Sequence, residues 1–122
     1  MSDPFGRALL DFHHGEQSEP LIQFDGEQRR EHPIEQFYFE SFSTDGVGGY
    51  LDRQLTGPLL DVGAGAGRDA LHFQEAFETT ALEVSDNLVT LLRERGVEDV
   101  RHGNMFTLPE QFDADRFESV LL

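Results

Sequence analysis

Residues 59–67 read Leu-Leu-Asp-Val-Gly-Ala-Gly-Ala-Gly, an apolar run followed by three alternating glycines. Glycine tolerates a positive φ and has no Cβ, so such a loop turns sharply and lets a ligand approach its backbone closely. A helical pattern follows from Arg68, which is the arrangement of a nucleotide-type loop at the carboxyl end of a parallel strand. The carboxylate of Asp61 would repel a pyrophosphate, but it would attract a ligand that carries an ammonium or sulfonium group.

Strands and helices alternate along the chain from Pro58 onward. We expect strands at 59–62, 79–84, 97–102 and 117–122, a helix at 68–77, and a second helix from Ser85 or Asp86 to a stop at Gly96. This alternation predicts an α/β fold, a Rossmann-like doubly wound parallel sheet with helices on its faces.

The segment 1–57 has a different character, because it is polar and carries no strong strand signal. We expect loop around residues 15–30, a helix that starts at Pro33 and reaches Phe42, and a short helix at 49–55. The sequence thus divides into an N-terminal helical or loop segment, 1–57, and an α/β domain, 58–122.

The charge balance is extreme, with 24 acidic residues against 9 basic ones and a formal net charge of −15. All the basic residues are arginine. At molar salt the Debye length falls to roughly 3 Å, which screens this self-repulsion, so the composition is typical of a halophilic protein from a high-salt cytoplasm. A mesophilic acidic protein is the alternative.

Membrane and metal sites are not predicted. The chain has no apolar run of about 18 residues, and its first thirty residues lack a secretory pattern. It has no cysteine, so disulfides and thiolate metal sites are excluded. We expect a cytoplasmic protein.

Two further positions fall at predicted strand ends, where the glycine loop also lies. Glu83 ends the second strand and could accept hydrogen bonds from both hydroxyls of a ribose. After the third strand, the side-chain oxygen of Asn104 could accept from an adenine amino group, and the amide of Met105 could donate to the ring.

Taken together, these motifs resemble the class I S-adenosylmethionine-dependent methyltransferases, in order and in spacing. The resemblance rests on the glycine loop, on Glu83-Val-Ser, on Gly-Asn104-Met and on Phe117-Glu-Ser-Val-Leu, and covers residues 58–122. It implies that S-adenosylmethionine is the cofactor and that 58–122 is part of the domain that binds it. The implied cofactor-binding residues are Asp61, Gly63, Gly65 and Gly67 for the methionine portion, Glu83 for the ribose, and Asn104 with Met105 for the adenine. The family usually has Asp where this chain has Asn104.

The resemblance also implies a sheet of seven strands in the order 3-2-1-4-5-7-6, whereas this sequence is truncated after the fourth. We expect a fragment or a shortened relative, whose exposed fourth strand could form a homo-oligomer. The segment 1–57 would be the lid or the substrate side. A small molecule is the expected methyl acceptor, and no catalytic residue is predicted.

Two alternatives stay open. One is a non-catalytic cofactor-binding or interaction module. The other is an NAD-dependent dehydrogenase, since Gly65 to Ala70 also fits G-x-G-x-x-A. Asp61 and Asp69 argue against the dehydrogenase, because both would repel a pyrophosphate.

Overall fold

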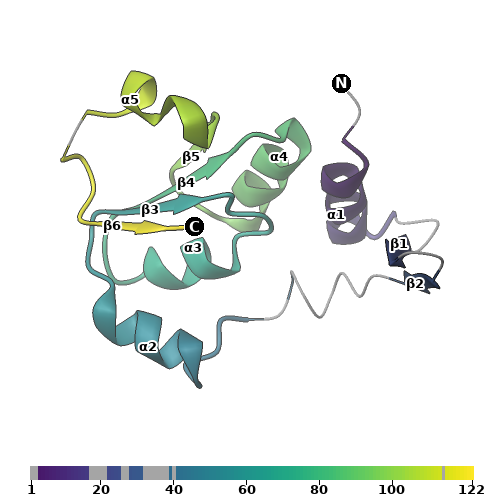
Figure 1. The fold of residues 1–122 in the computed structure, drawn as a ribbon, viewed down its shortest axis with the longest axis horizontal. Helices are drawn as coiled ribbons and strands as arrows, with labels where there is room; N and C mark the ends of the chain where they lie inside the picture. Colours follow the sequence, from purple (N-terminus) through teal and green to yellow (C-terminus); the bar gives the residue numbers. More distant parts are fainter. Residues whose placement is uncertain (1–2, 17–21, 26–27, 32–38, 40, 114) are drawn as a thin grey trace.

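The computed structural model describes residues 3–16, 22–25, 28–31, 39, 41–113 and 115–122 (Figure 1). Its centre is a four-stranded parallel sheet in the order β5-β4-β3-β6. The strands are β3 (Leu59–Val62), β4 (Thr79–Glu83), β5 (Val100–His102) and β6 (Ser119–Leu121). Numbered among these four strands alone, the order is 3-2-1-4, so the predicted parallel topology is confirmed.

Helices cover both faces of this sheet, as predicted for a doubly wound fold. On one face, α3 (Arg68–Phe73) and α4 (Asp86–Arg95) contribute Ala70, Val89 and Leu92 to a buried cluster with β4 and β5. On the other, Leu60, Val62 and Leu82 pack against Leu108, Phe112 and Phe117 around α5 (Leu108–Gln111), which follows the 3₁₀ helix η2 (Met105–Thr107). Figure 1 shows α3 and α5 on opposite sides of the sheet.

The ends of α4 confirm the caps expected from the sequence. Ser85 Oγ accepts a hydrogen bond from the Leu88 amide at 3.2 Å, and Gly96 ends the helix with a φ of 102°. The prediction for α3 was too long, since the helix ends at Phe73 rather than Phe77. Its last turn tightens, because the Ala76 amide donates to the Phe73 carbonyl, and the chain then turns into β4.

The N-terminal segment differs most from expectation. A helix that the sequence analysis missed, α1 (Pro4–His14), begins where Asp3 Oδ1 accepts from the Gly6 amide at 3.0 Å. The loop predicted for 15–30 is wrong, because β1 (Ile22–Asp25) and β2 (Gln28–Glu31) form an antiparallel hairpin. The helix predicted at 49–55 is present as α2 (Val47–Gln54). The helix predicted from Pro33 lies mostly outside the described residues.

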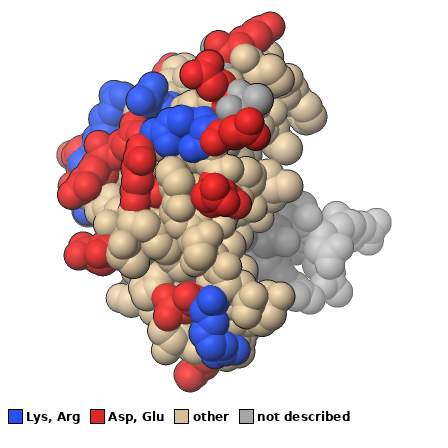
Figure 2. Space-filling view, turned by 90° about the vertical axis from the view of Figure 1, so that its left-hand side faces the viewer, with Lys and Arg blue, Asp and Glu red and all other residues tan. Residues whose placement is uncertain are grey.

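The strand β6 lies at the edge of the described sheet, where the Val120 residue is 52% exposed. Self-association through this edge stays a prediction. On the face shown in Figure 2, acidic side chains surround the arginines. Within the part of the chain that the structure describes, no helix has the length and apolar character needed to span a membrane.

Candidate functional site

The glycine loop leaves β3 with two of its glycines facing open space. Gly63 and Gly65 have φ values of 69° and 61°, and a Cβ built on either would meet no atom within 4 Å. The amide of Gly63 donates to the Leu82 carbonyl at 2.9 Å, which extends the pairing of β3 with β4 by one residue. The loop is therefore anchored at its base and open above, so a ligand could approach its backbone.

Gly67 serves the packing of the fold. Its φ is 89°, and a Cβ there would lie 2.8 Å from Leu92 Cδ2 and 3.2 Å from Val97 Cγ2. A side chain at this position would therefore push the loop away from α4. The predicted role of Gly67 in cofactor binding stays a prediction.

Asp61 is a buried carboxylate in the middle of the sheet, 4% exposed on the inner strand β3. Among the described residues, its Oδ2 atom has no hydrogen-bond partner. Burial raises the pKa of Asp61 to about 7, Asp69 and Glu83 raise it too, and Arg68 acts in the opposite direction. An unpartnered buried oxygen is costly, and a cationic group placed beside it would remove much of that cost.

Glu83 ends β4 beside the glycine loop and is 8% exposed. Its pKa is raised, mainly by burial and further by the carboxylate of Asp3, whereas the Val84 amide and His102 act in the opposite direction. Two acids with raised pKa values thus lie on neighbouring strands at the carboxyl end of the sheet. Such clustering is typical of a functional site.

A pocket of about 220 Å³ opens at these strand ends. It is lined by Val62, Gly63, Leu82, Glu83, Val84, Gly103, Asn104, Met105 and Phe106. Of the seven predicted site residues, the structure brings Gly63, Glu83, Asn104 and Met105 together here. The other three, Asp61, Gly65 and Gly67, lie outside the lining of this pocket.

Asn104 lies at the pocket, but its side chain already has a structural task. Its Oδ1 accepts a hydrogen bond from the Phe106 amide at 2.9 Å and so caps η2. The oxygen expected to meet an adenine amino group is therefore engaged in the fold. The contact with adenine stays a prediction.

The apolar rim of this pocket was not predicted from the sequence. Val84 is 64% exposed and Phe106 is 83% exposed, although both are apolar and line the pocket. The sequence could have indicated them, because each follows a predicted site residue by one or two positions. Exposed apolar side chains at a pocket mouth offer a surface for a flat ring.

Three other polar residues, which the sequence offers as candidates, have partners within the protein. Arg68 Nε lies 3.3 Å from Asp69 Oδ1. His102 Nε2 lies 2.8 Å from the Val84 carbonyl oxygen, so this residue fixes the chain at the pocket rim. His72 Nε2 lies 2.6 Å from Asp52 Oδ1 on α2, away from the pocket.

The fold is Rossmann-like, and Gly63 and Glu83 line a pocket at the carboxyl ends of its strands, where open α/β sheets generally bind their ligands. The chain belongs to the methyltransferase domain family, whose sequence profile matches residues 60–122, more than half of the chain. The family expected from the sequence motifs is therefore confirmed.

A solved structure supports this assignment. The chain is similar to a SAM-dependent methyltransferase from Bacteroides fragilis that was crystallised with S-adenosyl-L-homocysteine, at 34% sequence identity and a TM-score of 0.72. The alignment covers 85% of this chain but 44% of that one, so this chain spans less than half of its length.

A second likeness is weaker. The chain matches a structure described as "Conversion of a Disulfide Bond into a Thioacetal Group during Echinomycin Biosynthesis" at 26% identity and a TM-score of 0.41, over 46% of this chain and 27% of that one. No curated protein sequence matches the chain.

Proposed function

We propose that this chain binds S-adenosylmethionine and forms the cofactor-binding part of a methyltransferase. The observation that carries the proposal is the buried Oδ2 of Asp61, which has no partner in the described part of the chain and lies next to an open glycine loop. S-Adenosylmethionine carries an ammonium and a sulfonium group, which suit a carboxylate better than the pyrophosphate of a dinucleotide does. Family membership supports the same ligand.

Each group of residues has a part in this proposal. Asp61, Gly63 and Gly65 hold the methionine portion, Glu83 accepts hydrogen bonds from the ribose hydroxyls, and the pocket lined by Asn104 and Met105 receives the adenine. Gly67 supports the loop through its packing on α4. These residues bind and orient the ligand and exclude water from it.

When bound, S-adenosylmethionine would supply a methyl group on sulfur for in-line attack by a lone pair of the acceptor, and the electrons of the breaking carbon–sulfur bond would stay on sulfur. Such a transfer depends on alignment and exclusion of water more than on a dedicated base. The buried acids and the apolar rim supply both for the adenosyl part. The N-terminal segment 1–57 would contribute to the lid or the acceptor side, which the position of α1 beside the glycine loop supports.

Calorimetric titration tests the proposal directly. S-Adenosylhomocysteine and NAD would each be titrated into the chain in concentrated KCl, because the net charge of −15 favours a high-salt environment. We expect saturable binding of S-adenosylhomocysteine and none of NAD. Binding of NAD alone would favour a dehydrogenase, and binding of neither would favour a non-catalytic interaction module.

A further inference from the structure

The glycine loop has a second side, which faces away from the open glycines. Ala66, between Gly65 and Gly67, is 3% exposed and belongs to a buried cluster on that side. The cluster joins Ala66 to Leu9 and Leu10 of α1 and to Leu88 and Leu91 of α4. The loop is thus open toward a ligand on one side and packed against two helices on the other.

Arg95, in the last turn of α4, fixes this outer side by a polar contact. Its Nη1 atom donates a hydrogen bond to the Ala66 carbonyl oxygen. Its Cζ atom also lies 4.9 Å from the ring centroid of Phe39, so the guanidinium lies between an aromatic ring and the loop. Arg95 therefore holds a main-chain atom at the centre of the glycine loop.

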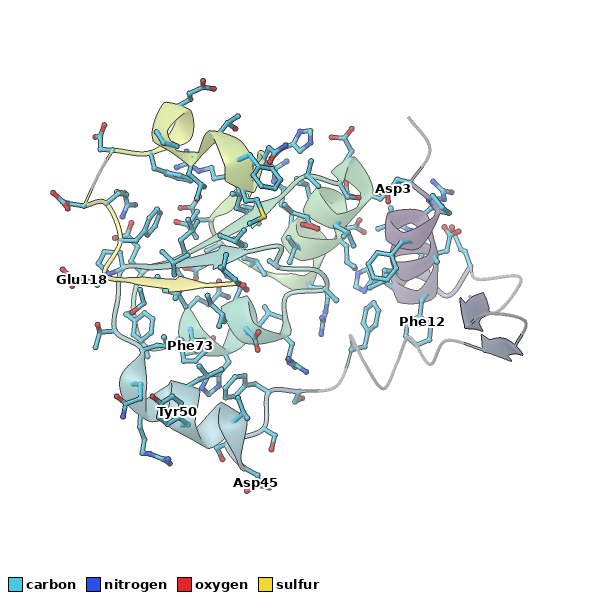
Figure 3. The ribbon with its side chains drawn as sticks, in the orientation of Figure 1. Asp3, Phe12, Asp45, Tyr50, Phe73 and Glu118 are labelled. Atoms are coloured by element: carbon cyan, nitrogen blue, oxygen red, sulfur yellow. The ribbon has the colours of Figure 1, made fainter. Side chains whose placement is uncertain are left out.

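Contacts at the N-terminus of α1 hold this helix against the start of α4, and Figure 3 labels Asp3 at this end of α1. The Asp3 carboxylate accepts hydrogen bonds from Ser85 Oγ and, at 3.4 Å, from Asn87 Nδ2. Gly6 lies so close to Ser85 that a Cβ there would overlap the Ser85 hydroxyl. Since Ser85 comes two residues after Glu83, α1 contacts the surroundings of both halves of the site.

We propose that Arg95 and α1 form an outer clamp that holds the glycine loop in its binding conformation and thereby sets the affinity for the adenosyl ligand. The identity of that ligand rests on the function proposed above. Arg95 is a positioning residue here, because it acts on the ligand through Ala66. Helix α1 lies outside residues 60–122, the part matched by the family profile.

The physical reason is preorganisation. A loop with three glycines samples many backbone conformations when it is free, and binding a ligand would have to order it. The clamp orders the loop before the ligand arrives, so less binding free energy is lost. If the clamp opens, the apparent affinity falls in proportion to the population of the binding conformation.

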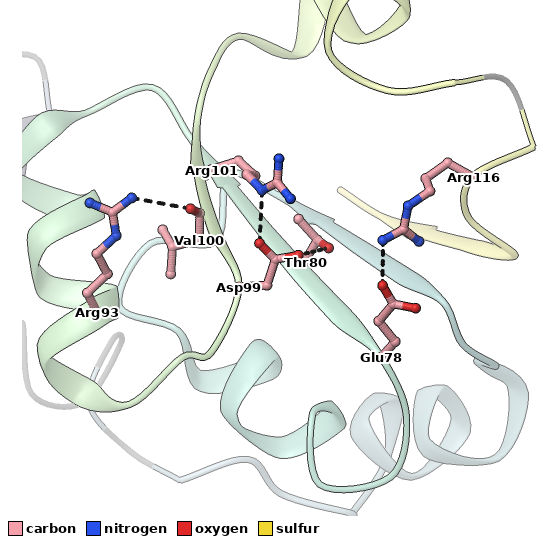
Figure 4. A network of polar contacts seen from close by, with 7 residues as sticks. All are labelled: Glu78, Thr80, Arg93, Asp99, Val100, Arg101 and Arg116. Atoms are coloured by element: carbon pink, nitrogen blue, oxygen red, sulfur yellow. Dashed lines mark hydrogen bonds and ion pairs between the residues drawn. The ribbon is translucent and has the colours of Figure 1, made fainter.

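The test compares two arginines of the same helix. Arg95→Met removes the bond to Ala66, and Arg93→Met is the matched control, because Arg93 Nη2 donates to the Val100 carbonyl at 3.4 Å, away from the loop (Figure 4). Arg95→Lys keeps a single cationic donor and tests for partial rescue. Three quantities would be measured in concentrated KCl: amide hydrogen exchange at residues 63–67, the dissociation constant for S-adenosylhomocysteine, and the unfolding temperature without ligand.

A second pair of variants probes α1. Gly6→Ala improves the helix propensity of α1 but places a methyl group against the Asp3 carboxylate and the Ser85 hydroxyl, so it should break the contact between Asp3 and Ser85. Arg7→Ala is its control, since the Arg7 side chain is 63% exposed and forms an ion pair within α1, with Asp11.

The clamp predicts faster exchange at residues 63–67 and about tenfold weaker S-adenosylhomocysteine binding in Arg95→Met and Gly6→Ala, with partial recovery in Arg95→Lys. Both controls should stay within about twofold of the wild type, even at an equal loss of unfolding temperature. Unchanged loop exchange in Arg95→Met, or an equal loss of affinity in Arg93→Met, would overturn the clamp. If the wild type shows no binding while loop exchange still responds to Arg95→Met, the function proposed above fails and the holding of the loop stands.

Discussion

At the amino ends of the parallel strands, Asp99 accepts hydrogen bonds from Thr80 Oγ1 at 2.7 Å and from Arg101 Nε at 2.9 Å (Figure 4). At the carboxyl ends, Oδ2 of Asp61 has no such partner among the described residues. Burial acts to raise the pKa of Asp99, but the bonds from Arg101 and Thr80 outweigh it, and the pKa is lowered. For Asp61, burial dominates and the pKa rises to about 7.

The two carboxylates differ in whether the fold supplies their hydrogen-bond partners. A carboxylate whose partners belong to the fold stabilises the folded chain in its ionised form, as Asp99 does. Asp61 and Glu83 are more buried than Asp99, and both pKa values are raised. Ionised acids in that position destabilise the folded chain, and under the proposed function a bound cationic group would give them a partner.

The largest expected effect is on the pH dependence of the unfolding free energy. The pKa of Asp61 in the folded chain, about 7, lies above its ordinary value of 3.8, so its contribution to stability is fully present below pH 4 and is lost as pH rises through 7. Relative to Asp61→Asn, the ligand-free wild type should lose about 3 kcal/mol of unfolding free energy between pH 5 and pH 8. Urea denaturation of both proteins at the two pH values measures this loss. The same change in unfolding free energy for both proteins would show that the pKa of Asp61 is not raised.

The next effect concerns affinity. Glu83→Gln should weaken S-adenosylhomocysteine binding about 30-fold, or about 2 kcal/mol, because a neutral amide replaces the charged acceptor of the ribose hydroxyls. Glu75→Gln, on the exposed surface after α3, is the matched control and should bind as the wild type does. Calorimetry measures the dissociation constants of both variants. Equal affinities would show that Glu83 does not bind the ligand.

Asp99→Asn is expected to act on stability alone. It should lower the unfolding free energy by about 1.5 kcal/mol, because the bonds from Thr80 and Arg101 lose their charged acceptor. The affinity for S-adenosylhomocysteine should change less than twofold, since Asp99 lies at the opposite end of the strands. If Asp99→Asn folded as stably as the wild type but bound S-adenosylhomocysteine weakly, the proposed division between a structural amino end and a ligand-binding carboxyl end of the strands would be wrong.

The smallest effect is that of Arg101→Met. The Arg101 side chain is 56% exposed, so its loss should destabilise the fold by less than about 1 kcal/mol. It should nevertheless raise the pKa of Asp99, because the first of the hydrogen bonds that lower it is removed. An NMR titration of the Asp99 carboxyl carbon measures this pKa. An unchanged pKa would mean that hydrogen bonds from the fold do not explain why Asp99 and Asp61 differ in pKa.

The sequence predicts the α/β part of this fold because its signals are local. The apolar run at 59–62, the glycine loop and the cap residues Ser85 and Gly96 each determine their own backbone conformation. The same signals were present at α1, where Asp3, Pro4 and Gly15 mark the two ends of the helix. The hairpin was missed because Ile22 and Phe24 alternate with polar residues over only four positions, among residues typical of loops.

The candidate site was predictable to the extent that it depends on residue type and strand ends. Glu83 and Asn104 line the same pocket because parallel strands bring their carboxyl ends together, and their contacts with a cofactor stay a prediction. The contact of Arg95 with Ala66 could not be predicted, because it joins two residues through a main-chain oxygen whose direction only the folded loop fixes. The capping role of Asn104 was hidden for the same reason.

The most direct test of the account is the affinity for S-adenosylhomocysteine at pH 6 and at pH 8, measured for the wild type and for Asp61→Asn. The ammonium group of S-adenosylhomocysteine favours the ionised carboxylate, so below pH 7 binding should release a proton, and the wild-type affinity should rise about tenfold from pH 6 to pH 8. Asp61→Asn should bind more weakly than the wild type at pH 8 and should show a smaller dependence on pH. Equal affinities for the two proteins at both pH values would contradict the claim that this buried carboxylate is the partner of the ligand's ammonium group.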